Sequence, residues 1–288
     1  ELSFDKFIPG HDRVYRLLAK AEDIWGAGFT TATLNSDIRL PLQSQAAVVE
    51  SLTQVSRGGA IMRYKDKEFH EDGNVVATDP SFFKVFDYPL AYGDANMVLD
   101  RPLSIVISPA VVKKYFGDEN PVGKILSFSG SSFGDVEYNC TVTGLFGNLP
   151  PNSSFQFDFV VNIPPERAKS DAIRYYNRVY GYTIIEGEVS VQTETFVKLK
   201  GAALYPRLRM SFDDLLERSS MKQLTFKYKK FRLTSEKLDD IHFFSSSSST
   251  LEKRGNFPLL LPLIVLAARG LALAGLRVLN LTPARATP

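Results

Sequence analysis

The densest aromatic segment of the chain is residues 77–94, ATDPSFFKVFDYPLAYGD. Phe82, Phe83 and Phe86 fall within five consecutive positions, behind an Asp-Pro pair that is typical of a helix start. Phe82, Val85 and Phe86 share one face of such a helix, because side chains three and four residues apart are neighbours. Burying each ring contributes roughly 1.5–3 kcal/mol. No nucleophile, metal-ligand set or phosphate loop accompanies them, so the segment predicts core rather than a catalytic centre.

Strand and helix patterns alternate along the rest of the chain. Residues 14–18 fit a strand or a helix, Asp72-Gly73 is a turn signal, and Lys229-Lys230 interrupts one alternating pattern in the manner of a bulge. Strands are predicted at residues 60–64, 74–78, 104–108, 123–129, 136–146, 155–163, 194–199 and 224–234. Helices are predicted at residues 41–52, after Asp79-Pro80, after Ser108-Pro109, and at residues 213–218. Several hairpins interrupt this order, so it predicts an α+β fold rather than a regular βαβ repeat.

Overall charge argues against a dedicated nucleic-acid binder. The 288 residues carry 34 basic and 32 acidic side chains, a net charge of +2, and 44% are hydrophobic, enough for a sizeable core. One stretch, LTFKYKKFRLT at 224–234, still combines stacking rings with charge. A nucleic-acid strip and an attraction to anionic headgroups are two interpretations of this stretch. We favour an amphipathic strand with its aromatic face inward. The side chains concerned are Phe226, Lys227, Tyr228, Lys229, Lys230, Phe231 and Arg232.

One catalytic pattern occurs, GSSFG at residues 130–134, with Ser132 in the nucleophile position of G-x-S-x-G. That chemistry needs a strand before the serine and a helix after it. Strand patterns flank this segment on both sides, so we favour a glycine-rich hairpin loop over a hydrolase. The single cysteine, Cys140, is expected to be a buried small hydrophobic residue.

The histidines do not form a metal-ligand pattern. His11, His70 and His242 are far apart in the sequence, and none has a partner two to four residues away with ligand spacing. Asp239, Asp240 and His242 are expected on a short strand, where they cannot all point one way, so we interpret them as surface polar groups. No phosphate-binding glycine loop is present. We therefore predict no catalytic, cofactor-binding or metal-binding residue, and no enzymatic activity.

An apolar segment lies near the C-terminus. As a helix, residues 257–281 would reach about 37 Å, enough to cross a bilayer. Arg269, Pro258 and Pro262 interrupt it, and a buried helix is the alternative. We favour the start of a transmembrane helix, because the polar segment 245–256 in front of it is typical of a linker. Glu1 opens mid-pattern, so the chain is expected to be cut from a longer protein.

Three segments together resemble a known family. They are VVATDPSFFKVFDYPLAYGD, SIVISPAVVKKYFGDENPVGKIL and YNCTVTGLFGNLPPNSSFQFDFVV, and they resemble the extracytoplasmic domain of MacB/FtsX-type ABC transporter permeases. ELSFDKFIPGHDRVYRL is similar to the segment that follows the first membrane helix of such permeases. LDDIHFFS is similar to the segment that precedes their second membrane helix. The order of segments agrees along most of the chain, while residues 165–193 and 201–225 match poorly.

The resemblance implies a fold of two mixed α/β subdomains, one inserted in the other. Residues 1–95 and 190–244 would form a discontinuous membrane-proximal subdomain, and residues 96–189, bounded by loop signals, the inserted one. The resemblance also implies a non-enzymatic domain that belongs to a protein of the bacterial inner membrane and faces the periplasm. A separate ABC ATPase would drive it, a periplasmic or outer-membrane protein would be its partner, and the full permease would be a homodimer or pseudo-dimer. A membrane-anchored sensor or binding module that regulates a separate enzyme is the alternative.

Overall fold

A computed structural model describes residues 3–130, 136–163 and 192–245, together with Arg167, Ser170, Asp171, Ile173, Arg174 and Ser247. The described residues form a mixed α and β fold, which confirms the coarse fold class expected from the sequence. Ser132 lies outside the described residues, as do the expected apolar helix at 257–281 and nearly all of the expected linker at 245–256. Within the described residues no helix is long and apolar enough to cross a membrane.

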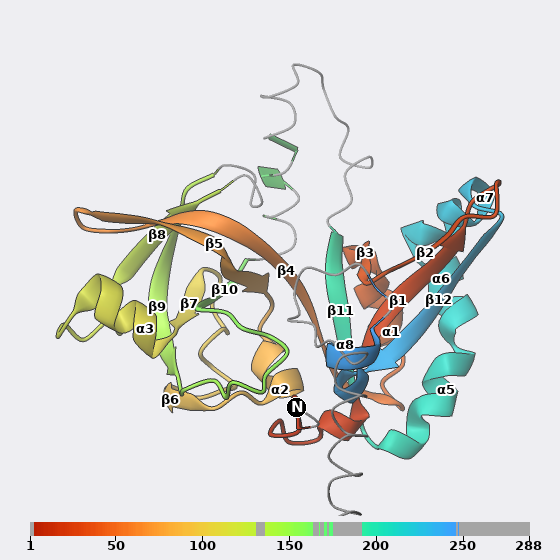
Figure 1. Ribbon diagram of the computed structural model, residues 1–288, viewed down its shortest axis with the longest axis horizontal. Helices are drawn as coiled ribbons and strands as arrows, with labels where there is room; N and C mark the ends of the chain where they lie inside the picture. Colours follow the sequence, from red (N-terminus) through yellow and green to blue (C-terminus); the bar gives the residue numbers. More distant parts are fainter. Residues whose placement is uncertain are drawn as a thin grey trace, which may run out of the picture. The chain divides into compact units, whose positions relative to one another are not determined.

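Twelve strands within the described residues join in one sheet, in the order β12-β1-β11-β4-β5-β10-β7-β9-β6, with β2 paired to β1, β3 to β11, and β8 to both β4 and β9. Most neighbours are antiparallel, but β10 runs parallel to β5, and β7 runs parallel to β9. Figure 1 shows these strands with their helices. The strands are β1 (Val14–Glu22), β2 (Gly28–Thr31), β3 (Thr33–Asn35), β4 (Val49–Tyr64), β5 (Lys67–Thr78), β6 (Leu90–Tyr92), β7 (Ser104–Ile107), β8 (Ile125–Ser129), β9 (Tyr138–Phe146), β10 (Phe159–Asn162), β11 (Gln192–Leu199) and β12 (Lys230–Lys237).

The helices are short. The α-helices are α1 (Arg39–Gln43), α2 (Phe82–Phe86), α3 (Pro109–Val111), α5 (Tyr205–Met210), α6 (Phe212–Glu217), α7 (Leu224–Lys227) and α8 (Leu238–Phe244). The 3₁₀ helices are η1 (His11–Arg13), η2 (Ser36–Ile38), η5 (Ala202–Leu204) and η6 (Ser220–Gln223), and η3 (Val112–Phe116) is a π-helix. With so few turns each, their stability comes from the face they bury rather than from helix propensity.

Strand β4 lies inside the sheet and joins the strands on its β11 side to those on its β5 side. Its residues 49–55 pair with β11, and its residues 56–64 pair with β5. The register shifts between Gly58 and Ala60, where the single residue Gly59 of β4 faces residues 72–74 of β5, so β5 carries the bulge. Strand β4 itself continues from one partner to the other without interruption.

The core consists of three clusters. One contains Phe82, Phe83 and Phe86, each exposed by 2% or less, which confirms that the aromatic segment is core. A second lies between β4, β5 and the strands β7–β10, and includes Cys140, a buried residue as predicted. The third lies between β1, β11 and β4 on one side and α5 and α6 on the other. The aromatic segment therefore fills the middle cluster, whose rings come from α2, β9, β11 and the chain before β10.

The helix predicted at 41–52 is wrong. Pro41 lies inside the short α1, and the chain enters β4 at Val49. Val49 and Leu52 are buried in the third cluster, and Leu52 faces Val197 of β11. Long-range pairing with β11 outweighs the local preference for helix.

The turn predicted at Asp72-Gly73 is also misplaced. Strand β5 continues through both residues, and Gly73 has a positive φ of 67° within the bulge of β5, opposite Gly59 of β4. The hairpin turn between β4 and β5 is at Lys65-Asp66, with Lys65 at a φ of 54°. Asp-Gly favours positive φ in both a turn and a bulge, so the dipeptide alone does not distinguish them.

Two predicted strands near the C-terminal side are helical in part or entirely. Residues 224–234 form α7 and then, from Lys230, β12, rather than one strand with a bulge. Residues 238–244, expected on a short strand, form helix α8. Leu238 and Ile241 lie three residues apart and are both fully buried, and acidic side chains occupy the first turn, where they stabilise a helix.

Candidate functional site

The two segments that flank the domain lie against each other. The ring of Phe4 stacks on that of His242 in α8, with centroids 3.4 Å apart and an interplanar angle of 9°. Close to this stack, His11 Nδ1 and Asp239 Oδ1 are 2.5 Å apart. We call residues 3–13 together with α8 the terminal junction. It ties the start of the described chain to its last helix.

The N-terminal part of the terminal junction is also bound to the loop between β9 and β10. Asp5 accepts a hydrogen bond from the backbone N–H of Ser154 at 2.9 Å, and its own N–H donates to Asn152 at 2.9 Å. The Asn152 amide donates to the Ser3 carbonyl at 2.8 Å. Asp5 is fully buried, and burial raises its pKa above the ordinary value despite hydrogen bonds from Ser154 and Ser153.

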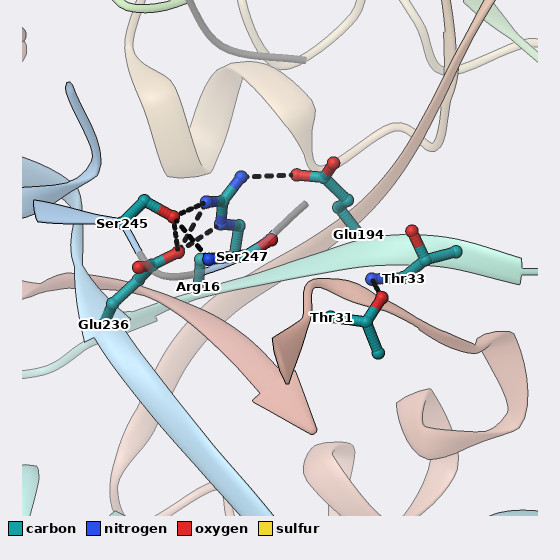
Figure 2. A network of polar contacts seen from close by, with 7 residues as sticks. All are labelled: Arg16, Thr31, Thr33, Glu194, Glu236, Ser245 and Ser247. Atoms are coloured by element: carbon teal, nitrogen blue, oxygen red, sulfur yellow. Dashed lines mark hydrogen bonds and ion pairs between the residues drawn. The ribbon is translucent and has the colours of Figure 1, made fainter. Parts of the chain in front are cut away.

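A buried arginine joins the terminal junction to the sheet. Arg16 of β1 is fully buried, and its guanidinium lies 2.9 Å from the Glu194 carboxylate of β11 and 2.8 Å from that of Glu236 in β12 (Figure 2). It also donates to the hydroxyl of Ser245, directly after α8, at 2.9 Å. One side chain therefore links three strands to the residue where the chain leaves α8.

A second buried carboxylate, Asp79, binds the start of α2 to β4. It accepts hydrogen bonds from the Gln54 N–H at 2.8 Å and from the Ser81 N–H at 2.9 Å, and Arg39 pairs with it at 2.8 Å. Asp79 was expected to be the N-cap of this helix, but Ser81 holds that position. The predicted cap at Ser108 is confirmed, because its hydroxyl accepts from the Val111 N–H at 3.3 Å.

The histidines and acidic residues do not gather as a metal site. Within the described residues no group of three or more His, Cys, Asp or Glu side chains could hold an ion. His242 is buried, which corrects its interpretation as a surface group, while Asp240 is exposed. Burial acts to raise the pKa of Asp239, but hydrogen bonds from Lys237 and His11 outweigh it and the pKa is lowered.

The other sequence-predicted candidates remain separate from the terminal junction. Burial raises the pKa of the Cys140 thiol to about 12, so the thiol is protonated and inert at neutral pH. In the basic–aromatic stretch the prediction of an inward aromatic face is only partly right. Phe231 packs against the third core cluster, but Phe226 is 83% exposed.

Sequence reasoning missed Arg16, the most connected polar residue of the site. Its signal was present, since Arg16 lies in the run VYRLLA, where a charge in a buried strand demands a partner. Its partners Glu194 and Glu236 are 178 and 220 residues away in sequence, so no local pattern connects them with Arg16. The pairing depends on β1 lying between β11 and β12.

The matched family agrees with this fold. The profile of the MacB-like periplasmic core domain matches residues 2–214, most of the chain, so the chain belongs to this family. The family resemblance inferred from the sequence is thereby confirmed. No curated protein matched the chain.

Three solved structures are similar to this chain. A domain of a protein described as a permease from Porphyromonas gingivalis has 19% identity and a TM-score of 0.59, over 88% of this chain and 98% of that one. The extracellular domain of the noncanonic ABC-type transporter YknZ from Gram-positive bacteria has 11% identity and a TM-score of 0.47, over 77% and 99%. The periplasmic region of MacB from Actinobacillus actinomycetemcomitans has 16% identity and a TM-score of 0.46, over 78% and 90%.

Proposed function

We propose that this chain is the extracytoplasmic domain of an ABC transporter permease subunit and that it relays movement without catalysing a reaction. A separate ATPase drives the membrane helices, and the domain, facing the periplasm from the inner membrane, passes their displacement to a substrate or to an envelope partner. Membership of the MacB-like periplasmic core domain family supports this placement. We further propose that residues 257–281 begin a membrane helix after the linker 245–256, and that 96–189 is the inserted subdomain.

The observation that carries the proposal is the terminal junction. Residues 3–13 contact α8 through the ring stack of Phe4 and His242 and through the pair of His11 and Asp239. The same segment binds the loop before β10, and Arg16 binds the residue after α8 to β11. A displacement of either flanking segment therefore acts on both ends of the sheet through short polar contacts. Buried ion pairs resist separation, because a charge left without its partner costs several kcal/mol.

An insertion experiment tests the relay in the full-length permease with its ATPase. Four residues, Gly-Ser-Gly-Ser, are inserted between Gly10 and His11, where a positive φ already marks a turn. We expect ATP hydrolysis to persist while export or partner activation is lost. The matched control is the same insertion after Gly117, another glycine with positive φ at the end of η3, which should leave both activities intact.

Two results would contradict the proposal. One is export that survives the insertion after Gly10, because movement would then bypass the terminal junction. The other is purification of the full-length protein without any ATPase, together with a single membrane anchor. That outcome would favour a sensor that regulates a separate enzyme.

A further inference from the structure

The face of β1, β2 and β12 that points away from the third core cluster has an unusual arrangement of charge. Arg16, Leu18, Lys20 and Glu22 alternate onto this face of β1, because successive strand residues point to opposite sides. Register pairs Arg16 with Glu236 and Glu22 with Lys230, two pairs of opposite charge. Between them, Lys20 lies directly opposite Arg232.

This like-charge pair has no counter-ion in the described part of the chain. Neither Lys20 nor Arg232 makes an ion pair or side-chain hydrogen bond with a described residue, whereas the neighbouring Lys229 and Lys230 both bind Glu22. Like charges directly opposite each other in a sheet are destabilising. An external anion on this face would remove that repulsion and gain charge-assisted hydrogen bonds.

The two cations line an open groove of about 680 Å³. Thr30 of β2 lies opposite Lys20 on the other side, so Thr30, Lys20 and Arg232 form a row across three strands. A pocket of this size accommodates several side chains of a ligand. The residues lining the groove are Lys20, Ala21, Glu22, Gly28, Phe29, Thr30, Lys230 and Arg232.

Exposed apolar side chains lie in the turn between β1 and β2, which joins the groove residues Glu22 and Gly28. This turn presents Ile24 and Trp25, which are 67% and 85% exposed. Asp23 does not neutralise the groove's cations, because its carboxylate accepts the N–H groups of Trp25 and Ala27. Large apolar side chains beside unpaired cations are typical of a surface that binds another protein.

The position of the groove argues against lipid as its ligand. Strand β1 begins beside the terminal junction and runs nine residues to the turn, about 30 Å at roughly 3.3 Å per residue. Figure 1 shows α7 and β2 at one end of β12 and α8 at the other. This step rests on the proposed function, in which the terminal junction faces the membrane.

We propose that this groove binds an acidic segment of a partner protein, with carboxylates on Lys20 and Arg232 and apolar side chains on Trp25. Two charged hydrogen bonds fix its position, and the exposed Trp25 ring adds apolar contact. The charge complementarity identifies the partner's chemistry as acidic peptide rather than nucleic acid, since the chain as a whole is nearly neutral.

Trp25 provides a site-specific readout, because it is the only tryptophan among the 288 residues. The experiment titrates the whole chain with a hexaglutamate peptide at low salt and follows tryptophan emission. We expect saturable binding that weakens with salt, and no binding of hexaglutamine. Arg232→Gln and Lys20→Gln should each weaken binding by about tenfold or more, the effect of losing one charged hydrogen bond. Lys113→Gln, an exposed lysine far from the groove in sequence and sheet, is the matched control and should bind as the parent does.

The variants also report on folding. Arg232 is exposed, so Arg232→Gln should keep the melting temperature or raise it by relieving the repulsion with Lys20. Absence of saturable hexaglutamate binding, or an equal loss in Lys113→Gln, would overturn the proposal. Equally tight binding of inorganic phosphate would assign the groove to small anions instead. Emission changes with phosphatidylglycerol vesicles, but not with peptide, would assign it to a membrane. None of these results bears on the insertion after Gly10, so the two proposals fail separately.

Discussion

Arg16 shows how one buried charge can hold distant segments together. Its two carboxylate partners come from β11 and β12, and both are nearly inaccessible, with side chains exposed by 7% and 11%. We expect Arg16→Met to lower the free energy of unfolding by about 3–5 kcal/mol, because Glu194 and Glu236 would both lose the buried guanidinium that binds them. Urea unfolding of the whole chain measures this loss.

A charge-neutral combination separates lost packing from lost charge compensation. Arg16→Met together with Glu194→Gln and Glu236→Gln should recover a large part of the stability, since the two carboxylates that Arg16 compensates are then replaced by neutral groups. A single variant that loses less than about 1 kcal/mol would mean that water reaches the two carboxylates.

The buried carboxylate of Asp5 is expected to lower the stability at neutral pH, and this effect depends on pH. Its pKa is raised in the folded state, so folding favours the protonated carboxyl and stability falls as pH rises from the unfolded pKa, about 3.9, through the folded one. Asp5→Asn keeps an acceptor for the Ser154 N–H and tolerates the positive φ of 57° at this position. We expect the variant to be more stable than the parent at pH 7. The difference in stability between variant and parent should shrink below about pH 4, where the carboxyl becomes protonated in the folded and in the unfolded state. An equal difference in urea unfolding at both pH values would refute the argument.

At the scale of elements, α2 ends on an unfavourable residue. Asp87 adopts the left-handed conformation (φ 52°, ψ 36°) directly after Phe86, and it is exposed. The position suits glycine, and a negative charge at a helix C-terminus opposes the helix dipole. We expect Asp87→Gly to raise the free energy of unfolding by about 0.5–1 kcal/mol. The control Asp118→Gly, at an exposed loop residue without positive φ, should be neutral or destabilising, and the same effect in both would count against the backbone explanation.

Local sequence predicted those elements whose signals are local. The aromatic segment, the cap at Ser108 and helix α6 were found from spacing and capping residues. Elements that depend on distant partners were missed. Val49 becomes a strand residue because β11 lies beside it, and 238–244 becomes a helix because Leu238 and Ile241 reach the middle core cluster. The Arg16 network could be suspected from one charge in an apolar run, but its partners could not be named before the strand order was known.

At the scale of the whole molecule, the boundaries of the inserted subdomain at 96 and 189 stay a prediction. Limited proteolysis of the whole chain tests them. We expect first cleavages near residues 93–95 and 186–191, with the fragments remaining associated in a native gel because paired strands hold them. Early cleavage in the middle of 96–189 or of 1–95 would contradict these boundaries.

Strand β4 limits how such a domain can be recombined. The cluster around Cys140 contains Met62 of β4 and Val75 of β5 beside residues from β7 to β10. Replacing residues 96–189 with those of another family member would therefore change only one side of this cluster. The introduced β8 and β10 would pack against the original β4–β5 hairpin. We expect chimaeras to fold when the β4–β5 hairpin is exchanged along with residues 96–189, because the side chains that contact each other in this cluster then come from the same protein.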